Sequence, residues 1–255
     1  MFNRYRTQGF VIKKENFREA DQIFTIFTED FGKLKILGRG IRKIQSKLRG
    51  GVKLFCGSEI EFIQGKSYKT LTDTALINNF RNIEKTLEKL LVSYKISGIL
   101  DELVKGEERD EKIWNLLWEV LSRLDNLSSG DEWERLKVVY YYFLWNLLSI
   151  LGYRPQLGRC VFCQKKNPGE IYFSPKEGGM VCGRCFRKAE EAKRITPNVT
   201  EILKIISNKD WNTLFRLKMT SPSLDALAVF SDNYLKVIKD NLGIGRSTCG
   251  YSSLP

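Results

Sequence analysis

Two closely spaced cysteine pairs constrain the fold of this chain more than any other feature of its sequence. Cys160 and Cys163 form one pair, Cys182 and Cys185 form the other, and eighteen residues lie between the pairs. Each pair can present two thiolates from one tight turn, and two such turns complete a tetrahedral shell, so the spacing predicts a zinc site. Because four thiolates leave no open coordination position, the predicted ion is structural, with one per chain. Disulfides or four inert buried thiols are the alternatives.

The chain contains no histidine, and this limits its chemistry. Ser-His-Asp and Cys-His nucleophiles are impossible, and acid–base catalysis near neutral pH is harder without imidazole. Two glycine motifs are incomplete: Gly65-Lys66-Ser67 follows Ile60 where a P-loop needs glycine, and Gly38-Arg39-Gly40 is only half of a dinucleotide fingerprint. We therefore expect a binding protein and not an enzyme.

Positive charge is concentrated in two parts of the chain. The 255 residues include 42 basic and 30 acidic side chains, which gives a net charge of +12. Residues 1–79 have a net charge of +7 and residues 151–195 of +6, whereas residues 80–150 have −3. Such a basic protein most often binds nucleic acid, and less often an acidic membrane surface or an acidic partner. Without a signal-peptide pattern or a membrane-length apolar run, we expect a cytoplasmic protein with no membrane partner, in which Cys56 and Cys249 are reduced thiols.

The first 79 residues have the pattern of a small β-barrel. Short runs of β-branched and aromatic residues alternate there with turn residues. The expected strands are 9–12, 22–28, 33–37, 52–63 with a bulge at Gly57, and 68–77. Five short strands favour an OB-fold, the commonest small barrel that binds nucleic acid, although the pattern alone also fits an SH3-like barrel.

From Phe80 onward the apolar period changes from two residues to about 3.6, which predicts helices. The first is expected to have six residues on one face: Phe80, Ile83, Leu87, Leu90, Leu91 and Tyr94. The others are expected at 113–124, at 133–151 behind an Asp131 cap and central in a bundle, at 197–206 and at 221–243.

These patterns predict an α+β multidomain protein. Its expected parts are an OB-fold at 1–79, an all-α domain at 80–156 and 196–243, a four-cysteine zinc module inserted at 157–195, and a flexible tail at 244–255.

The segment from Phe31 to Ser58 contains eight basic residues and no acidic residue. Glycines at both ends of residues 38–51 suggest a mobile loop that can follow an irregular single strand. We predict DNA contacts from Lys33, Lys35, Arg39, Arg42, Lys43, Lys47 and Arg49. A solvated basic loop without a ligand is the alternative. Four aromatic residues could stack on bases, but we interpret each as barrel core: Phe24, Phe27, Phe31 and Phe62.

The cysteine module carries a second group of positive charges. A candidate second nucleic-acid surface comprises Arg159, Arg184, Arg187 and Lys188. Alternatively, these charges only offset the formal −2 charge of a zinc ion held by four thiolates. From the sequence, both interpretations stay open.

Several stretches stand in a distinctive order along nearly the whole chain. They are Leu37-Gly-Arg-Gly-Ile-Arg-Lys, Ser46-Lys-Leu-Arg-Gly, Leu151-Gly-Tyr-Arg-Pro-Gln-Leu, Cys160-Val-Phe-Cys, Phe173-Ser-Pro-Lys-Glu-Gly-Gly and Cys182-Gly-Arg-Cys. With the basic barrel and the helical region around the cysteines, this order resembles the RecO family of bacterial DNA-repair and recombination mediators. Not every RecO-like protein keeps the four cysteines, whereas this chain has all of them.

The resemblance implies an N-terminal OB-fold, a helical C-terminal domain and a non-enzymatic function at the bacterial nucleoid. It also implies binding of single- and double-stranded DNA and annealing of complementary strands. The implied partners are RecR, the acidic C-terminal tail of the single-stranded-DNA-binding protein SSB, and indirectly RecF and the recombinase RecA. The residues by themselves also fit a zinc-ribbon protein that binds RNA or associates with the ribosome or the transcription machinery.

Overall fold

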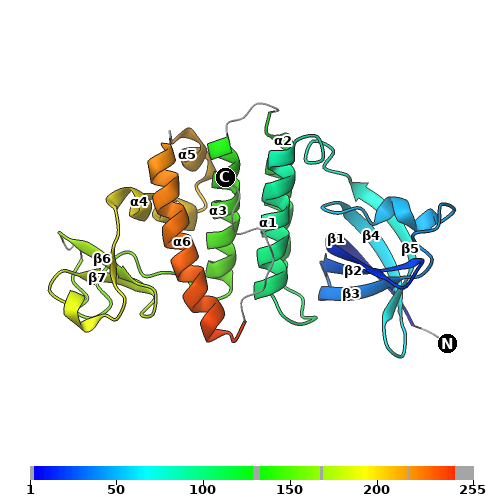
Figure 1. Cartoon of the computed structure of the whole chain (residues 1–255), viewed down its shortest axis with the longest axis horizontal. Helices are drawn as coiled ribbons and strands as arrows, with labels where there is room; N and C mark the ends of the chain where they lie inside the picture. The colour runs from blue at the N-terminus through cyan, green and yellow to red at the C-terminus, as the bar shows by residue number, and fades with distance from the viewer. Residues whose placement is uncertain (1–2, 129–132, 167–168, 218, 245–255) are drawn as a thin grey trace. The chain divides into compact units, whose positions relative to one another are not determined.

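The computed structural model describes residues 3–128, 133–166, 169–217 and 219–244. The chain forms two compact units, residues 1–130 and residues 131–255 (Figure 1). The first unit contains a β-barrel and two long helices, and the second contains the remaining helices and a small sheet. Among the described helices, none is long and apolar enough to cross a membrane. The finer division into a helical domain and an inserted module stays a prediction.

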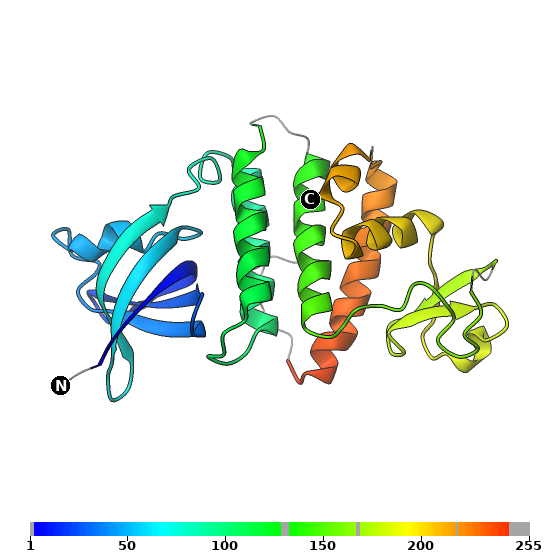
Figure 2. The same ribbon diagram turned by 180° about the vertical axis from the view of Figure 1, so that it is seen from behind.

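The first unit is built on a closed barrel, visible from both sides in Figures 1 and 2. Its strands are β1 (Arg4–Phe17), β2 (Asp21–Thr28), β3 (Gly32–Gly38), β4 (Gly57–Gln64) and β5 (Lys69–Asn78). The order is β1-β2-β3-β5-β4, and β4 pairs back to β1. Only the β3–β5 pair is parallel among these described strands. This arrangement confirms the predicted five-stranded OB-fold.

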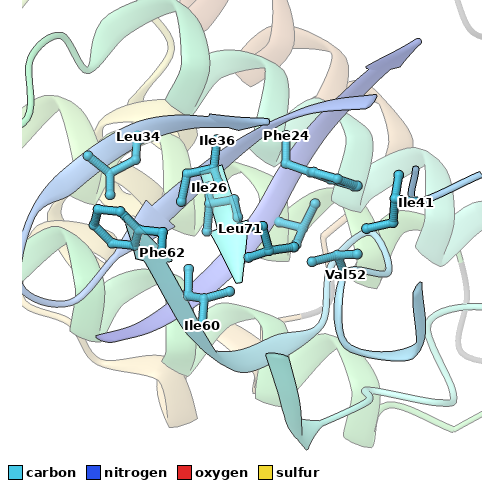
Figure 3. Packing of buried hydrophobic residues seen from close by; sticks show 10 residues of the cluster. Phe24, Ile26, Leu34, Ile36, Ile41, Val52, Ile60, Phe62 and Leu71 are labelled. Atoms are coloured by element: carbon cyan, nitrogen blue, oxygen red, sulfur yellow. The ribbon is translucent and has the colours of Figure 1, made fainter. Parts of the chain in front are cut away.

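Alternating strand residues point into the barrel and form its core (Figure 3). The buried cluster combines strand residues with Ile41 and Val52, which lie at one end of it. Of the four aromatic residues interpreted as core, three are fully buried and Phe31 is half-buried with its ring 5.8 Å from that of Phe62. That interpretation is confirmed, and these rings are not available to stack on a base.

Shortening a core side chain should destabilise the first unit strongly. Ile36 on β3 is fully buried in the cluster, so Ile36→Ala removes apolar contacts and leaves a cavity. We expect the free energy of unfolding to fall by about 2–5 kcal/mol. Urea denaturation of the whole chain, followed by hydrogen exchange of the barrel amides, measures the change. Lys35→Ala, at the neighbouring exposed position, is the control and should change stability little.

The connection between β3 and β4 differs from the expected mobile loop and early strand. It contains turns and a 3₁₀ helix, η1 (Lys47–Gly51), and β4 begins only at Gly57. Phe55 cannot continue a strand because its φ is +61°, and its N–H donates to the Val11 carbonyl at 2.9 Å. The predicted bulge is confirmed, since the β4–β5 register shifts between Gly57 and Ser58.

The predicted first helix was wrong at its start and in its buried face. The helix α1 (Leu87–Leu103) begins seven residues after Phe80, which has a φ of +38°. Leu87 is 66% exposed, whereas the buried positions include Val92, Ile96 and Leu100. Side chains compete with helix formation before Leu87, because the Asp125 carboxylate accepts the N–H groups of Asn82 and Ile83.

The second predicted helix is confirmed as α2 (Glu111–Asn126). Its expected apolar positions are all buried: Ile113, Leu117, Val120, Leu121 and Leu124. The Asp110 carboxylate caps its start by accepting the Ile113 N–H at 3.0 Å. Its Trp114 and Trp118 rings pack against Phe10 of β1, so the tryptophan pair is part of the core of the first unit.

The second unit is organised around α3 (Trp133–Ile150), as the broad apolar stripe predicted. It contacts α4 (Pro197–Ser207), α5 (Trp211–Arg216) and α6 (Ser221–Asn241), and it lies beside α6 in both views. The helices α4 and α6 were predicted, whereas the short α5 was missed. The expected Asp131 cap, Cys249 and the tail from residue 245 lie outside the described residues.

A three-stranded sheet, ordered β7-β6-β8, supports the cysteine module. Its strands are β6 (Ile171–Ser174), β7 (Gly179–Cys182) and β8 (Lys193–Arg194). Phe173 of β6 packs against Phe230 and Tyr234 of α6, with ring centroids 4.6 Å and 5.5 Å away. The Tyr234 hydroxyl in turn donates to the Tyr153 carbonyl at 3.1 Å. These contacts fix the sheet to the helices of the same unit.

Candidate metal centre and nucleic-acid interface

The structure brings the four cysteines of the two pairs together. All four Sγ atoms lie within 4.8 Å of one another, and only Cys163 among them is exposed. Around a tetrahedral zinc ion with Zn–S bonds of about 2.3 Å, sulfur atoms stand about 3.8 Å apart. The distance from Cys163 Sγ to Cys182 Sγ is 3.6 Å, too long for a disulfide and close to that spacing. The cluster could therefore hold one tetrahedral metal ion.

Each pair lies in a backbone turn that directs both sulfurs inward. In the first turn the Gln164 N–H donates to the Cys160 carbonyl at 2.9 Å, and Gln164 adopts a φ of +59°. The second turn follows β7, where the Cys185 N–H donates to the Cys182 carbonyl at 2.9 Å. It continues into η2 (Phe186–Lys188).

Backbone donors favour the charged form that a metal ligand requires. Burial acts to raise the pKa of Cys160, but hydrogen bonds from the backbone N–H groups of Cys163, Cys182 and Phe162 lower it to about 6. Cys56 behaves differently, because burial raises its pKa to about 11. It is a free thiol, as expected, and donates to Asn79 Oδ1 at 3.0 Å.

The basic residues predicted on the barrel do not all share one environment. Lys33 is only 12% exposed, and its ammonium group donates to the Asp101 carboxylate at 3.0 Å and to the Asp101 carbonyl at 2.6 Å. Its charge is thus offset within the first unit. The other six predicted side chains are exposed and lie on β3, in the following turns or on η1: Lys35, Arg39, Arg42, Lys43, Lys47 and Arg49.

Two of these side chains line a cavity of about 720 Å³ beside the barrel. Its cationic lining consists of Arg42, Arg49, Lys14 and Lys53, and no carboxylate is among the described lining residues. The buried side chains of Ile41 and Val52 form an apolar part of its wall. Within the described parts of the chain, none of the four cations forms a salt bridge.

The cavity depends on tertiary structure that local sequence patterns do not contain. Lys14 was missed because it lies on β1, far in sequence from the basic segment. Lys53 was counted in that segment but not among the expected contacts. A hydrogen bond from Arg42 Nη1 to the Glu19 carbonyl, 2.9 Å long, ties the basic turn to the β1–β2 hairpin. Lys14 lies on the β1 arm of the same hairpin, where it pairs with Phe24 of β2.

The second predicted basic group lies on the metal module, and all four of its side chains are exposed. Arg159 precedes the first cysteine turn, Arg184 lies within the second, and Arg187 and Lys188 lie on η2. They do not line the barrel cavity, and they belong to the second compact unit.

The fold and these two sites define a class: a basic OB-fold protein whose helical unit carries a four-cysteine metal module. Residues 1–80 match the family described as "Recombination protein O N terminal", and residues 84–237 match "Recombination protein O C terminal". The chain therefore belongs to the RecO family.

Full-length relatives agree with this assignment. The chain is 30% identical over 224 residues to "DNA repair protein RecO" of Dehalococcoides mccartyi, which covers 88% of this chain and 86% of the relative. It is also 30% identical over 234 residues to the protein of that name from Acetivibrio thermocellus, which covers 92% of this chain and 91% of the relative. The protein of that name from Syntrophomonas wolfei is 30% identical over 225 residues, which cover 88% of this chain and 87% of the relative.

Proposed function

We propose that this chain is a non-enzymatic DNA-binding protein of recombinational repair. The observation that carries the proposal is the cavity lined by Lys14, Arg42, Arg49 and Lys53, which gathers on an OB-fold barrel four cations that form no salt bridge within the described residues. Membership of a family whose relatives are named DNA repair proteins supports it. Such a role places the protein with the chromosome, in the cytoplasm at the bacterial nucleoid.

The barrel holds the sugar–phosphate backbone and does not read base sequence. Arginine and lysine bind phosphates regardless of sequence, and each contact releases counterions. Phe24, Phe27 and Phe62 are buried in the barrel core and cannot stack on bases. Lys35, Arg39, Lys43 and Lys47 extend the positive surface beyond the cavity, whereas Lys33 is paired with Asp101 and is not part of the proposed surface.

The remaining parts of the proposal follow from the family. The chain binds single- and double-stranded DNA, anneals complementary strands and, with RecR, helps to load RecA onto strands coated with SSB. It contacts the acidic C-terminal tail of SSB, and RecF acts with it indirectly. The four cysteines hold one structural zinc ion, since zinc prefers a closed tetrahedral thiolate shell.

Salt-dependent binding tests the proposed function directly. We expect the purified chain to bind labelled single-stranded DNA, bare and SSB-coated, with a log–log salt slope steeper than about −3, because the four cavity contacts alone contribute about −0.7 each. RNA of matched sequence is the control ligand. Preference for the RNA, or exclusion by SSB, would contradict the proposal and favour an RNA-binding zinc-ribbon protein.

A further inference from the structure

Two exposed phenylalanines flank the candidate metal site, one at each cysteine turn. Phe162 lies inside the first turn and is 37% exposed, and Phe186 follows the second turn and is 39% exposed. Each is directly adjacent in sequence to a cysteine of the cluster, Cys163 or Cys185, whose sulfur atoms lie within 4.8 Å of the others. The two turns that carry these rings are therefore brought together at the cysteine cluster.

Neither ring is needed to attach the module to its unit. Phe173 has that role, because it is buried and contacts Phe230 and Tyr234 of α6. Phe186 packs at 4.3 Å against Tyr172 and still leaves over a third of its surface exposed. The buried module cluster is formed by cysteines and Val181, with Val161, Tyr172 and Ala189 packed against it, and includes neither Phe162 nor Phe186.

The segment that carries these rings has an excess of positive charge. Residues 157–195 contain nine basic and four acidic side chains, so a net positive charge remains even beside a four-thiolate zinc ion of formal charge −2. Two of the acids are already engaged, Glu170 with Arg194 and Glu190 with Lys176. Six exposed cations form no salt bridge within the described residues: Arg159, Lys165, Lys166, Arg184, Arg187 and Lys188.

We propose that the metal module is a second nucleic-acid site, which stacks unpaired bases on Phe162 and Phe186 and binds the flanking phosphates with these six cations. The charges require a polyanion, and the flat exposed rings require a partner that presents flat apolar faces. Single-stranded nucleic acid meets both requirements, whereas a duplex keeps its base faces stacked internally. The proposal rests on the proposed function and extends it, since the barrel cavity has no aromatic residue in its described lining.

This second site gives the two units different tasks. The barrel cavity holds a backbone through charge alone, and the module selects strands with unpaired bases. A chain with both sites can hold two strands at once and neutralise the phosphates of both, which annealing requires.

The experiment isolates the module by removing the barrel cations. In the whole metal-loaded chain carrying Lys14→Ala, Arg42→Ala, Arg49→Ala and Lys53→Ala, binding of a labelled oligo-dT and of an abasic strand of equal length is compared. We expect the dT strand to bind more tightly. Adding Phe162→Ala and Phe186→Ala should weaken dT binding by about tenfold or more and leave abasic binding nearly unchanged, because stacking acts only on bases.

Matched variants separate stacking from folding. Phe162→Tyr with Phe186→Tyr keeps both rings and should bind dT like its parent, whereas Phe162→Leu with Phe186→Leu keeps apolar volume without a ring and should show the loss. If the Phe162→Ala, Phe186→Ala variant has lost its metal, dT binding by the Phe162→Leu, Phe186→Leu variant tests the stacking instead. Equal affinity for dT and abasic strands, or full dT binding by the leucine variant, would overturn the second site. The proposed function would then still stand if the unmodified chain bound DNA.

Discussion

Replacing Cys160 and Cys163 with serine is expected to abolish metal binding and to unfold the module at residues 157–195. The buried cluster of this module consists of three of the four cysteines and Val181, with only a few apolar side chains around it. So small a cluster cannot stabilise the module by itself, and in zinc-finger peptides a structural zinc ion supplies about 10–16 kcal/mol. The metal should account for nearly all of the module's local stability.

Elemental analysis and limited proteolysis measure the two effects together. The unmodified chain should contain one equivalent of zinc and resist cleavage within the module, and the serine variant should have neither property. Cys56→Ser is the matched control, because that buried cysteine belongs to the first unit and a serine can keep the hydrogen bond to Asn79. A metal-free Cys160/Cys163 variant that resisted protease like the parent would show that the module folds without the ion.

The clustering of the four cysteines was predictable because the spacing within each pair determines its turn locally. Two residues between paired cysteines fix a turn, and the turn fixes where both sulfurs point, so Cys160 and Cys163 needed little tertiary context. The second pair needed only the β6–β7 hairpin, in which Ile171 faces Cys182. Strands β2, β3 and β5 were predicted for a similar reason, since runs of β-branched and aromatic residues between turn residues mark strands locally.

The errors arose where distant groups override a local pattern. The Asp125 carboxylate accepts hydrogen bonds from the backbone N–H groups of Asn82 and Ile83, so α1 begins later in the chain than predicted. The apolar periodicity near residue 80 does not reveal this contact. Lys14 reaches the cavity only because the β1–β2 hairpin lies against the basic turn. Lys33 looked equivalent to Lys35 in the sequence, but its pairing with Asp101 of α1 separates them. Charge density predicts a surface, and the fold decides which charges on it remain unpaired.

Replacing the four cavity cations with alanine is expected to cause the largest loss of DNA affinity. If each of Lys14, Arg42, Arg49 and Lys53 contacts one phosphate, the variant's log–log salt slope on single-stranded DNA should be less steep by about 3 units. Titrations of labelled single-stranded DNA over a range of salt concentrations measure both affinity and slope. These exposed side chains make no salt bridge within the described residues, and Arg42 loses an exposed hydrogen bond to the Glu19 carbonyl, so the change should leave the barrel folded.

A control must remove the same charge from the same unit without touching the cavity. Replacing Lys66, Lys105, Arg109 and Lys112 with alanine does so, since all four are exposed and none lines the cavity. Long-range attraction weakens equally in both variants, whereas only direct phosphate contacts change the number of released counterions. Equal slopes for the two variants would therefore show that the cavity does not contact DNA phosphates. A less steep slope in the cavity variant alone would locate the phosphate contacts in the cavity. A further variant lacking Lys35, Arg39, Lys43 and Lys47 would then show how far the strand extends along the barrel beyond the cavity.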